Sequence, residues 1–337
     1  MNVLLTSVGR RAYMVKYFKD VVGAEGEVHV CNSDNKSIAF KYADKKVISP
    51  LIYDDGYIPF LLNYCSKNSI DVVISLFDID LLMLSLHKEE FEKIGTKVIV
   101  SDSKMIEICN DKWETYLFLK NHGFNVPKSF LSIDEILEEI QIGKINCPIV
   151  VKPRYGCGSI SVAMAYDEED LRYLTKKANR DISNSYLKYE SSVTEQKVIY
   201  QECLNGQEYG ADIINDLNGN IQNVIVRKKI AMRSGETDIA ELVDEPVIKT
   251  ELEKLGMITR HIANMDCDVF LVNGSPYILE MNARFGGGYP FSHMGGCNLP
   301  KAIIEWARGN EIDQDLISVT TGITGFKEIY ITEVRND

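Results

Sequence analysis

The sequence predicts an α/β domain built on a parallel sheet, followed by a larger α+β region. Over the first hundred residues, short apolar strands alternate with amphipathic helices, which is typical of a parallel sheet covered on both faces. Beyond about residue 125, strands follow one another directly, and turn sequences such as Asn205-Gly206 predict hairpins. We therefore expect two layered units of different topology.

The sequence of the first unit predicts five strands and three helices. The expected strands are Val3–Leu5, Val28–Cys31, Lys46–Ile48, Val72–Ser75 and Val98–Val100. The expected helices are Arg11–Val22, Ile58–Lys67 and Leu81–Glu92. In sheets of this kind, ligands bind beyond the carboxyl ends of the strands.

Polar segments follow three of these strands, namely Ser7–Arg11, Asn32–Asp34 and Phe77–Asp80. Arg10 and Arg11 at a helix start are either an anion site or solvated residues of the first turn. Asp78 and Asp80 either face a substrate or cap the next helix. There is no G-x-G-x-x-G, so the dinucleotide-binding fingerprint is missing.

The second unit begins with a capped helix after Asp102 and a helix over Lys112–His122, and then changes character. Further helices are expected over Asp134–Gln141, Glu168–Ala178, Val247–Met265 and Asn298–Gly309. Expected strands are Ile149–Lys152, Ile160–Ala165, Val198–Cys203, Glu208–Asn215, Asn223–Lys228, Asp268–Val272, Tyr277–Met281 and Phe326–Val334. The Ser-rich residues 180–196 predict a mobile connection.

Composition indicates a globular protein, since 45% of the 337 residues are hydrophobic and 26% are charged. The net charge of −12 argues against a nucleic-acid or anionic-membrane surface. The chain lacks a signal-peptide pattern and an apolar run long enough to span a membrane. Its eight cysteines form no C-x-x-C pair, which favours reduced thiols and a cytoplasmic location.

The segment around Glu280 carries the strongest chemical signal. Glu280 and Asn282 are two residues apart on a predicted strand, so both project from one face, and Arg284 continues that line. A carboxylate, an amide oxygen and a nearby guanidinium suit a Mg²⁺ ion held against nucleotide phosphates.

Three further segments fit nucleotide binding. Lys152 ends an apolar strand before a turn that contains Gly156, Gly158 and Ser159, whose backbone N–H groups can bind phosphate oxygens. Glu202 and Leu204 lie at a strand end where free backbone groups could contact adenine, and Glu208 is suited to ribose hydroxyls.

In this order these features resemble the ATP-grasp superfamily, close to free-standing ligases similar to one half of the carbamoyl-phosphate synthase large subunit. The motifs are Asp111-Lys112, Val151-Lys152-Pro153, Gln201-Glu202, Gly206–Tyr209, Asp268 and Glu280–Arg284. The resemblance implies a pre-ATP-grasp domain over residues 1–105, an ATP-grasp domain over 106–310 with a lid at about 125–197, and a C-terminal segment over 311–337.

The resemblance also implies roles for individual residues. Lys112 and Lys152 would contact ATP phosphates, although Lys112 alone could be a surface lysine. Asp268, Glu280 and Asn282 would bind Mg²⁺, which Mn²⁺ can replace, and Arg284 would be catalytic. The family usually has Pro where Ala283 stands here, so that position lacks a ring-locked φ.

Substrate contacts are assigned to Arg10, Arg11, Asp78, Gly287 and, in a loop expected to lie over the site, Arg233 and Glu236. Residues 227–233 could instead be a solvated face. His293 is expected to be a packed histidine.

The predicted function is an ATP- and Mg²⁺-dependent carbon–nitrogen ligase that activates a carboxylate as an acyl-phosphate for attack by an amine. Its partners would be small carboxylate and amine substrates, and no nucleic acid or membrane is expected to bind. The chain could form a homodimer. The alternatives are carbamoyl-phosphate synthesis from bicarbonate and a non-catalytic ATP-binding regulator.

Overall fold

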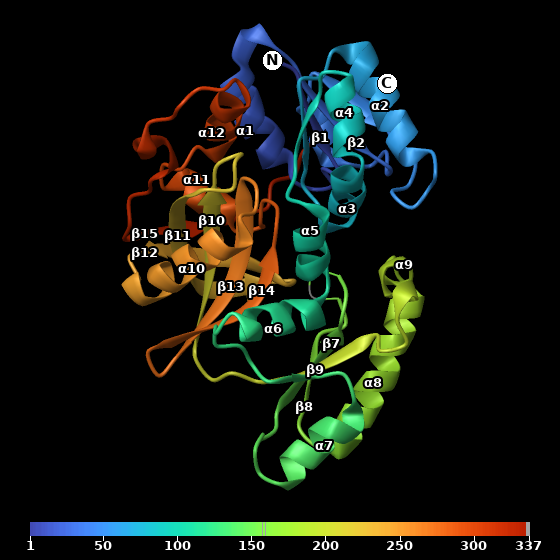
Figure 1. Ribbon diagram of the computed structural model, residues 1–337, viewed down its shortest axis with the longest axis vertical. Coiled ribbons are helices and arrows are strands. Elements are labelled where there is room, and N and C mark those ends of the chain that lie inside the picture. The colour runs from blue at the N-terminus through green and yellow to red at the C-terminus, as the bar shows by residue number, and fades with distance from the viewer. Residues whose placement is uncertain (157, 159, 335–337) are drawn as a thin grey trace.

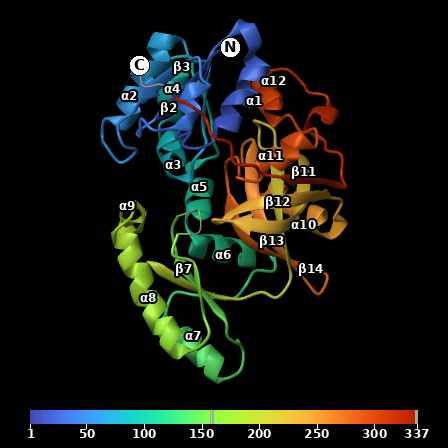
Figure 2. The same ribbon diagram turned by 180° about the vertical axis from the view of Figure 1, so that it is seen from behind.

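The computed structural model describes residues 1–156, 158 and 160–334, which form three sheets. In Figures 1 and 2 the blue N-terminal domain and the orange and red C-terminal sheet lie together, while a green and yellow lid projects from them. The lid has a hydrophobic core of its own, whereas the two core clusters of the remaining molecule contain residues of both other units. The lid is therefore the part that can move without disrupting another core.

The N-terminal domain contains the predicted parallel sheet, in the order β3-β2-β1-β4-β5. Its strands are β1 (Val3–Thr6), β2 (Val28–Asn32), β3 (Lys45–Ile48), β4 (Val72–Ser75) and β5 (Lys97–Ile99). Its helices are α1 (Ala12–Val22), α2 (Tyr57–Asn68), α3 (Asp78–Leu86) and α4 (Lys88–Lys93), with 3₁₀ turns at Gly23–Glu25 and Ile38–Lys41. The strand order reverses between β1 and β4, and ligands bind at the carboxyl ends of strands at such a point.

Two helices, α5 (Ser103–Asn110) and α6 (Lys112–Asn121), lead into the lid. The lid sheet has the order β6-β9-β7-β8. Its elements are β6 (Ser129–Phe130), α7 (Ile133–Gln141), β7 (Ile149–Pro153), β8 (Ala163–Ala165), α8 (Glu168–Ser183), α9 (Leu187–Glu190), a 3₁₀ turn (Ser191–Val193) and β9 (Val198–Glu202).

The C-terminal sheet is antiparallel and has the order β14-β13-β10-β11-β12-β15. Its strands are β10 (Gln207–Asn215), β11 (Ile221–Arg233), β12 (Glu236–Val243), β13 (Asn264–Val272), β14 (Ser275–Asn282) and β15 (Ile323–Phe326). The helices are α10 (Pro246–Thr259), α11 (Tyr289–Met294) and α12 (Leu299–Ala307), with a 3₁₀ turn at Gln314–Ile317. The predicted class, a parallel-sheet domain followed by an α+β region, is confirmed.

Several predicted boundaries are wrong. The helix expected over Leu81–Glu92 begins at Asp78 and is interrupted at His87. The connection expected to be mobile at 180–196 is largely helical, because Ile182 and Leu187 are buried in the lid core. Only the last three residues of the strand expected at 160–165 form a strand.

The C-terminal half differs from prediction in three places. The helix expected to reach Met265 ends at Thr259, because Arg260 takes a left-handed φ of +45° and Met265 pairs with Ile213 in the sheet. A polar segment expected to be a loop forms β12, which pairs with β11. The terminal strand lies over Ile323–Phe326 rather than 326–334.

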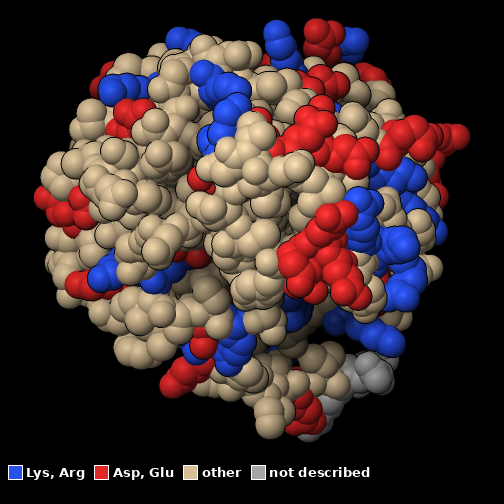
Figure 3. Space-filling view, turned by 90° about the horizontal axis from the view of Figure 1, so that it is seen from below, with Lys and Arg blue, Asp and Glu red and all other residues tan. Residues whose placement is uncertain are grey.

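The surface at the lid end carries Lys and Arg side chains interspersed with Asp and Glu, and neither sign covers that face (Figure 3). No helix in the described part of the chain has the length and apolar character needed to cross a membrane.

Candidate functional site

Two adjoining cavities lie where the three units meet. The first, which we call the lid cavity, has a volume of about 320 Å³ and lies between the lid sheet and the C-terminal sheet. The second, the central cavity, has a volume of about 370 Å³ and lies between the C-terminal sheet and the loops that follow β1 and β4. Both are lined by Gly158, Ile160, Lys229, Met232, Gly235, Asp268 and Glu280.

Two lysines from different elements line the lid cavity. Lys152 lies on β7 and is only 5% exposed, and its Nζ donates to Gln201 Oε1 at 2.8 Å. Burial lowers the pKa of Lys152 to about 8, against the opposing field of Glu280. Lys112 begins α6, and its ammonium group donates to the carbonyl oxygen of Gly156. Both lysines therefore line the same cavity as Gly156 and Gly158 of the glycine turn, as a phosphate site requires.

A buried ion pair fixes this arrangement. Arg154 Nε and Nη2 donate to the two oxygens of Asp111, each at 2.7 Å, and both residues are at most 9% exposed. Asp111 also caps α6, and the Lys112 N–H donates to the Arg154 carbonyl oxygen at 3.1 Å. A bidentate pair with cap bonds is among the stronger polar contacts in proteins. It joins the start of α6 to the glycine turn.

The lid cavity also contains the strand end that is predicted to contact adenine. Glu202 and Leu204 both line it, and β9 ends at Glu202, where the chain crosses from the lid to β10. Glu208 lines the same cavity from β10 and accepts from Lys229 Nζ at 2.7 Å. The predicted adenine contacts and the predicted ribose contact therefore border one cavity.

The three predicted metal ligands lie together on β13 and β14. Asp268 is the cross-strand partner of Glu280, and Asn282 Nδ2 lies 3.4 Å from Glu280 Oε1. Cross-strand partners have neighbouring side chains on one face of a sheet. Lys229 Nζ contacts Asp268 Oδ1 at 2.7 Å. Among the described residues there is no group of three or more His, Cys, Asp or Glu side chains with metal-binding geometry.

The donor chemistry nevertheless fits a Mg²⁺ ion whose remaining ligands are phosphate oxygens. Burial raises the pKa of Asp268, and the ammonium group of Lys229 opposes this shift. Burial of Lys229 lowers its pKa, but the carboxylates of Asp268 and Glu208 outweigh this effect, so the pKa of Lys229 is raised. Two carboxylates and an amide oxygen are hard ligands of the kind that Mg²⁺ binds when it bridges a nucleotide.

Arg284 follows β14 and lies between two carboxylates. Its Nε is 3.0 Å from Asp78 Oδ1, and its Nη1 donates to Asp266 Oδ2 at 3.1 Å. Asp78 comes from the N-terminal domain, at the first residue of α3. The guanidinium lines the central cavity next to Glu280 and Asn282. A buried cation at this point can offset negative charge that develops on a phosphoryl group.

The interpretation of residues 227–233 as a solvated face is wrong for Arg227 and Lys229. Arg227 is 1% exposed, and its Nη1 and Nη2 donate to Asp212 and Asp266 at 2.5 and 2.7 Å. It reaches Asp266 across β10 at Gly210, where a Cβ atom would lie 3.0 Å from Arg227 Nε. The sequence did contain a signal for this pairing. Arg227 and Lys229 are two residues apart, as are Asp266 and Asp268, so each pair lies on one face of its strand and the opposite charges can meet.

The glycines after Arg284 are required by this network. A Cβ atom at Gly286 would lie 2.1 Å from the Asp266 carboxyl group, and one at Gly288 would lie 2.2 Å from Arg227 Nε. Gly287 and Gly288 line the central cavity. The backbone of this loop can therefore approach a bound anion where a bulkier residue could not.

Most of the predicted substrate residues also line the central cavity, namely Arg10, Arg11, Glu236 and Gly287. Arg233 does not line it. Its guanidinium is bound to Asp238 and to the Lys327 carbonyl oxygen on the outside of the β11–β12 hairpin, so its predicted role as a substrate contact is not supported. The predicted phosphate contact Ser159 lies outside the described residues.

Two other predicted polar residues have clear partners. His293 is packed as expected, since its ring stacks on Tyr17 with centroids 3.6 Å apart and lies beside Tyr289 Oη. Asp80 neither faces a cavity nor caps a helix; it is fully buried beneath the carboxyl ends of β1 and β4.

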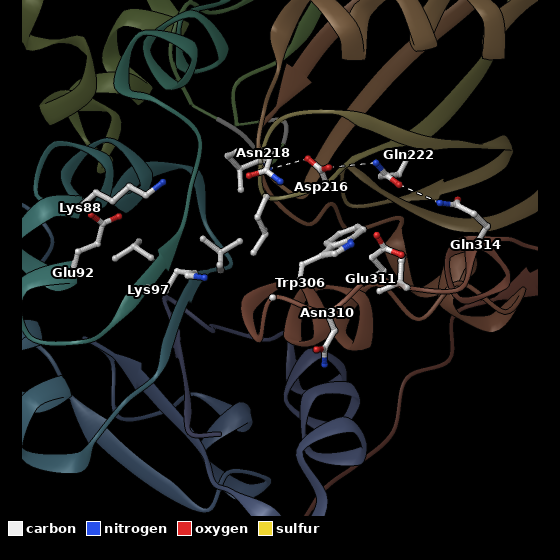
Figure 4. Close-up of a pocket in the computed structure, with 16 residues that line it drawn as sticks. Lys88, Glu92, Lys97, Asp216, Asn218, Gln222, Trp306, Asn310, Glu311 and Gln314 are labelled. Atoms are coloured by element: carbon white, nitrogen blue, oxygen red, sulfur yellow. Dashed lines mark hydrogen bonds between the residues drawn. The ribbon is translucent and has the colours of Figure 1, made fainter.

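A third cavity, of about 740 Å³, opens on the outer side of the molecule between α4, the β10–β11 turn and the end of α12. Figure 4 shows Trp306 beside polar side chains that largely bind one another, such as Gln314 with Gln222. Its charged residues, including Lys88 and Glu92, are exposed or half-buried. We assign it no ligand.

Comparison with known proteins places this geometry in a family. The chain matches the family model described as "PylC-like, N-terminal domain" over residues 3–99 and the model described as "ATP-grasp domain" over residues 109–288. It is 23% identical over 281 residues to the carbamoyl phosphate synthase large chain of Methanosarcina mazei, covering 79% of this chain and 25% of that protein. It therefore spans about a quarter of that relative.

The D-alanine–D-alanine ligase of Bacillus anthracis is 23% identical over 251 residues, which is 68% of this chain and 76% of that enzyme. Among solved structures, the biotin carboxylase domain of the Hydrogenobacter thermophilus 2-oxoglutarate carboxylase, in complex with MgADP, ADP and bicarbonate, aligns with a TM-score of 0.73. The identity is 16%, and the match covers 96% of this chain and 73% of that one, which shows a shared fold. Since the second family model alone spans more than half of the residues, the chain belongs to the ATP-grasp family.

Proposed function

We propose that this protein is an ATP- and Mg²⁺-dependent ligase that activates a substrate carboxylate as an acyl-phosphate and joins it to an amine. The observation that carries the proposal is that the lid cavity and the central cavity meet at Lys229, Asp268 and Glu280. A nucleotide in the first cavity would direct its phosphates toward a substrate in the second.

The proposed nucleotide contacts follow from the lid cavity. Lys112, Lys152 and the backbone at Gly156 and Gly158 would bind the phosphates, together with Ser159 of the same turn. Leu204 and Glu202 would contact adenine, and Glu208 the ribose. Asp268, Glu280 and Asn282 would hold Mg²⁺, which in this position neutralises phosphate charge.

The reaction then needs little covalent chemistry from the protein. The substrate carboxylate attacks the γ-phosphorus of ATP, and ADP leaves with the electron pair of the broken bond. Arg284 would offset charge on the transferring group, while the backbone of Gly287 and Gly288, which line the central cavity, would border the product. The amine nitrogen next attacks the acyl carbon and phosphate leaves, and Glu236, which lines the central cavity, would accept the released proton.

We further propose the three-part division at residues 105 and 310, with a lid over about 125–197, a cytoplasmic location and a homodimer. The cysteines in the described part of the chain are all free thiols, which supports a reducing compartment. Sedimentation analysis would show twice the chain mass of 38.1 kDa for a dimer.

The experiment is a screen of amino acids, short carboxylic acids and bicarbonate with Mg²⁺ and ATP, read by ADP and phosphate release. Hydroxylamine is added as a small nucleophile. We expect one class of acid to give ADP and its hydroxamate. Release of AMP, or a phosphorylated side chain, would overturn the proposal. No ADP release with any acid over hours would instead favour a regulator, and turnover with bicarbonate alone would favour carbamoyl-phosphate synthesis.

A further inference from the structure

Asp80 is a buried carboxylate that is held by hydroxyl groups alone. Its side chain is fully buried and, among the described residues, it forms no ion pair. It accepts from Thr6 Oγ1 at 2.7 Å, from Ser7 Oγ at 2.8 Å and from Tyr57 Oη at 2.9 Å, and also from the Ser75 hydroxyl. Because a buried charge is costly unless several groups bind it, this cluster needs an explanation.

Two of the four hydroxyl donors come from the strands at the reversal point of the sheet. Thr6 is the last residue of β1 and Ser75 the last residue of β4. Ser7, which follows β1, has a φ of +51°, a left-handed conformation that costs free energy for any residue with a side chain. Asp80 therefore holds the chain in a strained shape at the point where a sheet of this order binds its ligand.

The chain after Ser7 forms one wall of the central cavity. Residues 7–11 all line it. The loop is tied down elsewhere by Ser37 Oγ, which donates to the Gly9 carbonyl oxygen at 2.6 Å, and by Arg11. Arg11 Nη1 donates to the carbonyl oxygens of Leu76 and, at 2.8 Å, of Phe285, the residue after Arg284.

We propose that Asp80 is a positioning residue for the carboxylic acid substrate, which acts by holding the Ser7–Arg11 loop in the shape that binds this substrate. The inference rests on the proposed ligase function. Since Asp80 has no exposed surface, it cannot touch the substrate itself. Because the loop borders the central cavity but not the lid cavity, Asp80 should affect binding of the acid and not of ATP.

The chain offers a matched pair of variants. Ser7→Ala and Tyr57→Phe each remove one hydroxyl group from the same oxygen, Asp80 Oδ2. Ser7 belongs to the loop, whereas Tyr57 lies on α2 and lines neither cavity. Asp80→Asn keeps the size of the side chain and removes its charge.

The first measurement is the KM for the acid that gives the highest phosphate release in the screen, together with the KM for ATP. We expect Asp80→Asn and Ser7→Ala to raise the KM for the acid at least fivefold and to change the KM for ATP less than twofold. Tyr57→Phe should raise the KM for the acid less than Ser7→Ala does, and it should change the KM for ATP less than twofold. An unchanged KM for the acid in Asp80→Asn, or equal effects of Ser7→Ala and Tyr57→Phe, would overturn the proposal.

The second measurement needs no substrate. Amide hydrogen exchange of residues 8–12 should be at least tenfold faster in Asp80→Asn and Ser7→Ala than in the wild type and in Tyr57→Phe. Exchange that is unchanged, or equally faster across the whole sheet, would show that Asp80 only stabilises the fold. If Asp80→Asn does not fold, the Ser7 and Tyr57 variants decide the question. If no acid supports turnover, the ligase function fails, and the exchange rates alone test the positioning.

Discussion

The guanidinium of Arg284 is held from the other domain by the carboxylate of Asp78, with Nε and Oδ1 3.0 Å apart although the residues are separated by 206 positions in the chain. Arg284 is the residue to which we assign charge stabilisation in phosphoryl transfer. Its orientation therefore depends on how the N-terminal domain is seated against the C-terminal sheet.

This contact predicts an effect on turnover and not on ATP binding. Arg284→Ala should lower kcat on the order of 100-fold or more, and Asp78→Ala about tenfold, because Asp266 still holds the guanidinium in the second variant. Steady-state kinetics measures kcat, and calorimetry with ADP measures the affinity for the nucleotide. Asp102→Ala, which removes only the cap of α5, is the control for lost stability. A similar fall in kcat in that control would contradict the assignment.

The metal site predicts that charge at Glu280 is essential. Glu280→Gln should keep the fold and abolish Mg²⁺-dependent turnover, because a neutral amide binds a hard cation weakly. Glu251→Gln on α10, where Glu251 pairs with Lys254 at 3.0 Å, is a matched control. Thermal unfolding tests the fold and phosphate release tests the activity. A rate equal to that of the wild type at ordinary Mg²⁺ concentration would show that Glu280 is not a ligand.

Lys152 predicts a pH dependence of nucleotide binding. Burial lowers its pKa to about 8, so the ammonium group is charged below that pH and loses its charge as the pH rises through it. The affinity for ADP should be highest near pH 7 and should fall between pH 8 and 9.5, by up to about tenfold per pH unit. Calorimetry at four pH values measures this fall. Lys152→Met should weaken binding by about 1–3 kcal/mol and flatten the dependence. The same slope in the variant would exclude Lys152 as its origin.

The burial of His261 predicts a pH dependence of the free energy of unfolding. It is fully buried between the Ile213 carbonyl oxygen and Thr259, and burial lowers its pKa to about 4, well below the value of about 6.5 in unfolded chains. Because the folded form disfavours protonation of His261, the neutral imidazole contributes to the free energy of unfolding above pH 6.5. This stability is lost as the pH falls toward 4. Between pH 7 and 5 it amounts to about 2 kcal/mol. Urea unfolding at pH 7 and pH 5 should show that His261→Gln loses less free energy of unfolding than the wild type over this range. An equal loss in both proteins would refute the prediction.

Sequence patterns predicted those parts of the site that lie within single segments. Glu280 and Asn282 share a face because a strand has a period of two, and Lys152 was recognisable between an apolar strand and a glycine turn. The residues that escaped prediction depend on distant partners. Arg227 opens a run of three cations, Arg227–Lys229, which resembles a solvated segment, and Asp212 and Asp266 from other strands make its burial possible.

The same reason explains the errors in the fold. The segment 180–196 is polar and Ser-rich, yet Leu187 packs over Gly156, where a Cβ atom would lie 2.2 Å from its Cδ2. Tyr53 of the N-terminal domain donates to Glu190 Oε1 at 2.7 Å and stacks on Tyr189. The Tyr53 contacts join segments more than a hundred residues apart, and the contact of Leu187 with Gly156 also lies beyond one element, so local periodicity reports neither.

Transfer of an oxygen atom from the substrate acid to phosphate tests the acyl-phosphate most directly. If the carboxylate attacks ATP and the amine then attacks the acyl carbon, one carboxylate oxygen remains on the phosphorus. With an acid labelled with oxygen-18 in its carboxyl group, we predict that each phosphate released carries one labelled oxygen, as read by mass spectrometry. Unlabelled phosphate, or label recovered in AMP, would contradict the proposed reaction.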